Sequence, residues 1–138
     1  MEQSGKGNKE KRVHKRLPVT FPLLYSVKSP FMVRIRIGKT ERSAIAQDIA
    51  EGGIALLANF EIPVDTLLSL KFTILNEAIL SIEDRTHNFE LDAQVRYCVL
   101  VKESTYRLGV SFLNILPSER SYIANYIRIN SLIRNPNV

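Results

Sequence analysis

Apolar and polar residues alternate along much of the chain with a period of two, which is typical of half-buried β-strands. The clearest stretch is 88–101, where seven apolar residues from Phe89 to Val101 fall on one face and Arg96 and Cys98 fall on the other. Further runs of this kind lie at 19–27, 32–37, 43–50, 53–58, 68–74 and 106–112. The pattern predicts six or so short strands, with the last two runs, 88–101 and 106–112, forming a hairpin.

The pattern changes after Leu113. Pro117 and Glu119 are typical of a helix start, where a proline and an acidic residue suit the first turn. Apolar residues then follow a helical period, at Leu116, Ile123, Tyr126, Ile127 and Ile133. The pattern predicts a helix from Pro117 to about Leu132–Arg134. We therefore expect a mostly β fold, a small antiparallel barrel or sandwich whose terminal helix plugs one opening or covers an edge.

Composition fits one domain of ordinary size. The chain has 138 residues, of which 45% are hydrophobic and 24% charged, a globular balance. No apolar run has the length of a membrane span, and no secretory signal is visible. The single cysteine cannot form an internal disulfide, which favours a reducing, cytoplasmic setting. We divide the chain into a flexible N-terminal lead (1–11), a folded domain (12–134) and a short tail (135–138).

The positive charge is concentrated at the N-terminus. The net charge is +5, and residues 1–20 contribute +4 of it from six Lys and Arg and two Glu; the other 118 residues hold 13 basic and 12 acidic groups, a sum of +1. A nearly neutral body with a basic arm disfavours an RNA or DNA binder, which would carry basic and aromatic residues across a sheet face.

The sequence offers no catalytic constellation. His14 and His87 have no partner at metal-ligand spacing, and Cys98 has no histidine suggested beside it. Nucleotide-binding loops and the nucleophile motif of hydrolases are also absent from the sequence. We therefore expect a protein that is not an enzyme and that uses neither a metal nor a cofactor.

Two short segments stand out instead. Arg12 and Arg16 are four residues apart, on one side of the chain in an extended or helical conformation, and two guanidinium groups can clamp phosphates and stack on purines. Asp48, at the end of a strand, can accept two hydrogen bonds from the edge of guanine, and Gly52 and Gly53 permit a tight turn. Each segment alone is also compatible with a solubilising tail or an ordinary hairpin turn.

Together, the two segments resemble the PilZ family, whose signature is an Arg-x-x-x-Arg arm and an Asp/Asn-x-Ser-x-x-Gly turn. Here these are Arg12-x-x-x-Arg16 and Asp48-x-Ala50-x-x-Gly53. The resemblance covers roughly residues 11 to 133. It implies a six-stranded antiparallel barrel with a C-terminal helix and a flexible basic arm, which binds the bacterial second messenger cyclic di-GMP.

The resemblance also assigns site residues. Arg12 and Arg16 would hold phosphates and stack on guanines, Asp48 would accept from a guanine edge, and Gly53 would keep the turn open. Lys11 occupies a position that in the family influences how many nucleotides bind, and a basic residue there fits a stacked ligand dimer. Ala50 replaces the motif serine, so one hydroxyl hydrogen bond is missing. From strand alternation, we add the outward-facing Arg96.

We therefore expect a cytoplasmic signalling adaptor, a monomer or weak dimer, in which cyclic di-GMP orders the arginine arm against the barrel and alters the surface seen by a protein partner. Such a partner would belong to motility, pilus or exopolysaccharide machinery. Because of Ala50, the alternative is a degenerate interaction domain of the same family that binds no nucleotide.

Overall fold

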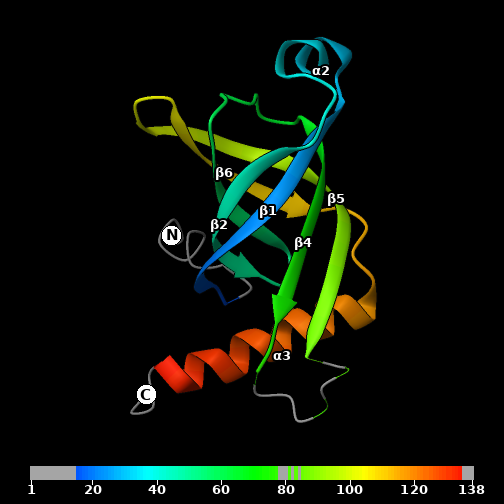
Figure 1. Cartoon of the computed structure of the whole chain (residues 1–138), viewed down its shortest axis with the longest axis vertical. Helices are drawn as coiled ribbons and strands as arrows, with labels where there is room; N and C mark the ends of the chain where they lie inside the picture. Colours follow the sequence, from blue (N-terminus) through cyan, green and yellow to red (C-terminus); the bar gives the residue numbers. More distant parts are fainter. Residues whose placement is uncertain (1–14, 78–80, 82, 84, 135–138) are drawn as a thin grey trace, which may run out of the picture.

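The computed structural model describes residues 15–77, 81, 83 and 85–134. These residues form six strands and two helices, ordered along the chain as β1 (Leu17–Ser29), α2 (Phe31–Ile37), β2 (Arg42–Ala50), β3 (Gly53–Ala58), β4 (Leu67–Leu75), β5 (Thr86–Lys102), β6 (Thr105–Phe112) and α3 (Pro117–Arg134) (Figure 1). The described residues do not include the predicted lead (1–11), the predicted tail (135–138) or two predicted site residues, Lys11 and Arg12.

The strands close into a barrel in the order β1-β2-β3-β6-β5-β4, and every neighbouring pair is antiparallel. The predicted six-stranded antiparallel fold is therefore confirmed. Pro22 pairs with Ile45 of β2, whereas pairing of β1 with β4 begins only at Leu24. Pro22 therefore lies where β1 pairs with β2 alone, a position that suits proline because it cannot donate to a ladder.

The prediction that seven alternate residues of β5 share one face is wrong beyond Val95. Val95 pairs with Val110 and Tyr97 with Gly109, so Arg96 is an extra residue in β5 and forms a β-bulge. A slip of one residue exchanges the two faces of a strand. Tyr97 is consequently 36% exposed, and Cys98, predicted on the outer face, packs against the core.

The segment 32–37, predicted as a strand, is helix α2. The sequence alternates as a strand would, but Val33 and Ile37 are also four residues apart, which places them on one side of a helix. Both are buried and both belong to the core. Gly38 ends the helix with a φ of 107°, a conformation that glycine tolerates, and its N–H donates to Arg34 O at 2.8 Å.

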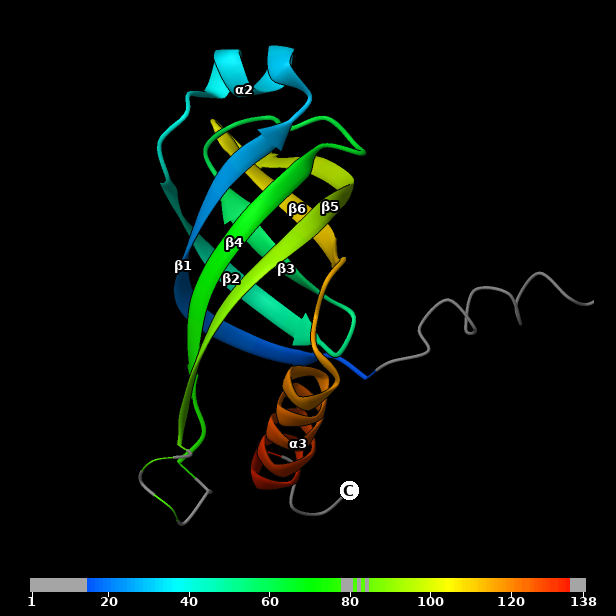
Figure 2. The ribbon, with the colours of Figure 1, turned by 90° about the vertical axis from the view of Figure 1, so that its right-hand side faces the viewer.

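The C-terminal helix α3 has the bounds that the sequence predicts, and it lies across one end of the barrel (Figures 1 and 2). Ile123 and Ile127 are buried, but Leu116 and Ile133 are exposed and do not extend the apolar stripe. Oε2 of the buried Glu119 lies 3.0 Å from Nε2 of His87, so this histidine joins β5 to α3. Among the described residues, no helix is long and apolar enough to cross a membrane.

We expect Ile123→Ala to lower the free energy of unfolding by about 2–5 kcal/mol, because it opens a cavity where α3 meets the barrel. Denaturant titration measures this change. The matched control is Leu132→Ala on the same helix, where the side chain is 55% exposed and little should change. Equal effects of the two substitutions would contradict the docking of α3 through Ile123.

Candidate functional site

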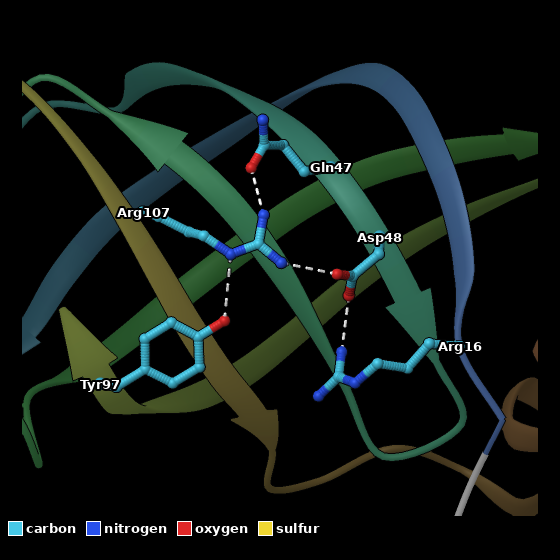
Figure 3. A network of polar contacts seen from close by, with 5 residues as sticks. All are labelled: Arg16, Gln47, Asp48, Tyr97 and Arg107. Atoms are coloured by element: carbon cyan, nitrogen blue, oxygen red, sulfur yellow. Dashed lines mark hydrogen bonds and ion pairs between the residues drawn. The ribbon is translucent and has the colours of Figure 1, made fainter. Parts of the chain in front are cut away.

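Two segments distant in sequence meet at the carboxylate of Asp48 (Figure 3). Arg16 Nη1 donates to Asp48 Oδ1 at 2.6 Å, although the two residues are 32 positions apart. Arg107 Nη2 donates to Asp48 Oδ2 at 2.7 Å. The Asp48 side chain is only 15% exposed, so both of its oxygens lie in charge-assisted contacts that are partly shielded from water.

Strand register explains why these side chains meet. In the β1–β2 ladder, Pro18 lies opposite Asp48, which brings Arg16, two residues earlier, alongside that carboxylate. On the other side, Asp48 pairs with Ala55 of β3, and Ala55 pairs with Gly109 of β6. Arg107 is two residues from Gly109, on the same outer face of the sheet.

A β-bulge in β2 adds Gln47 to the site. Ala46 pairs with Leu56 and Asp48 with Ala55, so Gln47 is unpaired in this ladder. Ala46 and Ile49 are fully buried, and the two residues between them both face outward. Arg107 Nη1 accordingly donates to Gln47 Oε1 (Figure 3).

The bulge in β5 adds Tyr97. Arg107 Nε donates to the Tyr97 hydroxyl at 3.3 Å. A Cβ at Gly109 would lie 2.0 Å from Cε2 of the Tyr97 ring, so this glycine provides the space that the ring occupies. We call Arg16, Gln47, Asp48, Tyr97 and Arg107 the Asp48 network. Arg16 comes directly before β1, and the other members come from β2, β5 and β6.

The Asp48 network carries a net positive charge, because two guanidinium groups face one carboxylate. Burial alone would lower the pKa of Arg107, but its contacts with Tyr97 and Asp48 outweigh that effect and raise the pKa above its ordinary value. Arg107 therefore stays protonated. Arg16, whose side chain is 37% exposed, remains accessible, so the network suits an anionic ligand that offers hydrogen-bond donors to Asp48.

The other predicted site residues have different surroundings. Ala50 is 5% exposed and pairs with Gly53. A Cβ at Gly53 would lie 2.2 Å from the backbone oxygen of Val110, so this glycine lets β3 approach β6 closely. Arg96 is exposed, and its Nε donates to Ser111 Oγ at 2.7 Å. In the described part of the chain, no cluster of three or more His, Cys, Asp or Glu residues could hold a metal ion.

Sequence reasoning missed Gln47, Tyr97 and Arg107. The alternation in 106–112 does assign Arg107 to the outer face of its strand, so that residue could have been found as a charged outward position. Gln47 and Tyr97 gave no such signal, because both reach the site through bulges that depend on the pairing of β2 and β5 with their neighbours.

Comparisons with known proteins agree with the barrel. A sequence model of the family described as PilZ domain matches residues 10–128. The inhibitor of motility MotI/DgrA from Bacillus subtilis has a TM-score of 0.66 and 17% identity, over 89% of this chain and 52% of that chain. The PilZ domain of YcgR from Escherichia coli, solved with c-di-GMP, has a TM-score of 0.56 and 15% identity, over 93% and 99% of the two chains.

The MrkH–c-di-GMP complex of K. pneumonia has a TM-score of 0.59 and 15% identity, over 92% of this chain and 55% of that chain. At such identities, the likeness to solved structures is one of fold. The chain spans about half the length of the MotI/DgrA chain. No curated protein sequence matches this chain.

We expect Gly109→Ala to destabilise the fold by about 1–3 kcal/mol, because the new methyl group displaces the Tyr97 ring. In a Tyr97→Ala background, the same substitution should cost much less, since the ring is no longer there. A double-mutant cycle measured by denaturant titration isolates this coupling. If Gly109→Ala lowers the free energy of unfolding equally in the two backgrounds, the position of the Tyr97 ring does not depend on Gly109.

Proposed function

The chain belongs to the PilZ domain family, and from this membership we propose that it is an adaptor domain that binds cyclic di-GMP without catalysing a reaction. The YcgR and MrkH structures to which its fold is similar contain c-di-GMP. The proposal places its action in the bacterial cytoplasm, which agrees with a single cysteine and no internal disulfide.

One observation carries the proposal: residues from the two segments of the family motif meet in space. Arg16 ends the arginine motif and Asp48 begins the turn motif, and their side chains are 2.6 Å apart. Each segment alone is compatible with a surface tail or an ordinary turn. One ligand can contact both segments only if they lie side by side, as they do on the barrel wall.

The chemistry of the Asp48 network suits this ligand. A carboxylate has about four lone-pair positions, and Arg16 and Arg107 each use one of Asp48. The remaining acceptor capacity can take the N–H and NH2 groups of a guanine edge. The phosphates supply the negative charge that the two arginines favour, and a guanidinium plane can also stack on guanine.

The switch that we propose involves the residues before β1. When cyclic di-GMP binds, Arg12 and Arg16 gain phosphate partners, and residues 11–16 close over the ligand against the barrel wall near Asp48. Lys11 and the exposed Arg96 would add positive charge at the edges of this site. The closed segment presents a new surface to a protein partner in motility, pilus or exopolysaccharide machinery, because bound and free states differ in these contacts.

Ala50 favours a second candidate, an interaction domain of the same family that binds no nucleotide. Alanine provides no hydroxyl, and one hydrogen bond to a polar or charged group is worth about 0.5–3 kcal/mol. The small side chain at position 50, which is 5% exposed, does not by itself block a ligand. We therefore favour weakened binding over loss of binding.

Isothermal titration calorimetry with cyclic di-GMP tests the proposal. We expect saturable binding by the whole chain, weakened by about tenfold or more in Arg16→Ala and in Asp48→Ala, since each removes a charge-assisted contact. Arg36→Ala and Asp92→Ala are controls of matched charge outside the Asp48 network and should bind as the parent does. Equal weakening in Arg16→Ala and Arg36→Ala, together with tighter binding by both Asp variants, would indicate a general charge effect instead of a site.

A second substitution separates the two candidates. Ala50→Ser should strengthen binding by about several-fold to a hundredfold if the hydroxyl alone is missing. If the parent chain gives no heat and Ala50→Ser creates binding, the protein is a degenerate member of the family. If neither chain binds at high ligand concentration, the cyclic di-GMP proposal fails.

A further inference from the structure

Helix α2 presents an apolar face to solvent. Phe31, Met32 and Ile35 are 64%, 74% and 54% exposed, whereas Val33 and Ile37 are buried against the barrel. At 3.6 residues per turn, the three exposed side chains lie within one arc of about 100° around the helix axis. Large apolar side chains gathered on one exposed face mark an interaction surface.

Two arginines flank this face. On the same helical wheel, Arg34 and Arg36 lie on opposite sides of the apolar arc, each about 90–110° from its centre. Helix α2 contains no acidic residue. Arg36 Nη2 donates to the backbone oxygen of Glu61, and within the described residues neither arginine forms an ion pair with a carboxylate. Arg36 is exposed, whereas Arg34 is half-buried and its Nε is enclosed without a hydrogen-bond partner, so Arg36 offers the more accessible positive charge to a negatively charged partner.

The helix projects from one end of the molecule. Figures 1 and 2 both show α2 beyond the strands, at the end of the long axis opposite α3. A convex face of this kind fits a flat surface better than it encloses a protein segment. Strand β1 separates α2 from Arg16, so an object docked on α2 leaves the Asp48 network open.

We propose that this α2 face docks the protein onto an anionic lipid surface. The side chains of Phe31, Met32 and Ile35 enter the boundary between headgroups and acyl chains, as the apolar side of an interfacial helix does. The stems of Arg34 and Arg36 lie along this boundary and their guanidinium groups reach the lipid phosphates. Three apolar side chains and two charges give reversible association, not insertion.

Vesicle co-sedimentation of the whole chain tests the apolar contribution. We expect binding to mixed phosphatidylglycerol–phosphatidylcholine vesicles to fall by about tenfold or more in the double variant Phe31→Ser/Ile35→Ser, because burial of even one large apolar side chain changes an equilibrium constant by that order. The control is Leu132→Ser/Ile133→Ser on α3, where equally exposed side chains, at 55% and 65%, lie at the other end of the molecule.

A separate variant tests how much positive charge contributes to vesicle binding. Arg36→Gln should weaken binding by about fivefold, and vesicles of phosphatidylcholine alone should bind much less than the mixed vesicles. The basic N-terminal arm is unchanged in every variant, so differences between them report on α2. Cyclic di-GMP binding should stay as in the parent chain, which keeps this test separate from that of the ligand site.

Fluorescence locates the contact. The chain has no tryptophan, so Met32→Trp introduces a single reporter at a position that is 74% exposed. Its emission should shift to shorter wavelength with mixed vesicles, whereas Leu132→Trp should not respond. An unmoved Met32→Trp emission, or co-sedimentation unaffected by Phe31→Ser/Ile35→Ser, would overturn the proposal. If the Met32→Trp emission shifts to shorter wavelength without lipid, and the shift grows with protein concentration, the α2 face instead contacts a second copy of the protein.

Discussion

Closure of the strands into a ring fixes the register of each strand from both of its edges, and the rest of the structure depends on this constraint. The ladders on the two edges of one strand can differ in the number of residues that pair. A β-bulge accommodates the extra residue, at Gln47 in β2 and at Arg96 in β5. Each bulge turns one more side chain outward while its buried neighbour, Ala46 or Val95, stays fully buried. Core packing and surface chemistry are thus adjusted separately.

The two bulges lie on either side of β3 and β6, and the polar groups that they expose converge on Arg107 between them. One guanidinium group contacts an amide, a carboxylate and a phenol, and these contacts hold it in place. Gly109 makes this possible, because the Tyr97 ring lies where a side chain at position 109 would be. The proposed ligand site is therefore a product of sheet geometry as much as of the two motif segments.

The two ends of the barrel differ in a way that suits separate roles. Helix α3 covers one end and buries Ile123 and Ile127. At the other end, α2 buries two residues and leaves its remaining apolar side chains exposed. Strand β1 begins beside Arg16 and ends before α2, so it connects the proposed nucleotide site to the proposed lipid-docking face.

Local sequence indicated all six strands of the barrel and where α3 begins and ends, although it also assigned 32–37 to a strand, because side-chain periods of two and 3.6 are properties of a segment by itself. The motif resemblance also singled out Arg16 and Asp48, which the fold brings together. Only tertiary structure decided that 32–37 is helical. Its apolar pattern fits both a strand and a helix, and the helix is the conformation in which Val33 and Ile37 are both buried in the core. Tertiary structure likewise decided that Tyr97 faces outward to Arg107. Register belongs to pairs of strands, so no pattern within one strand can determine where a bulge will fall.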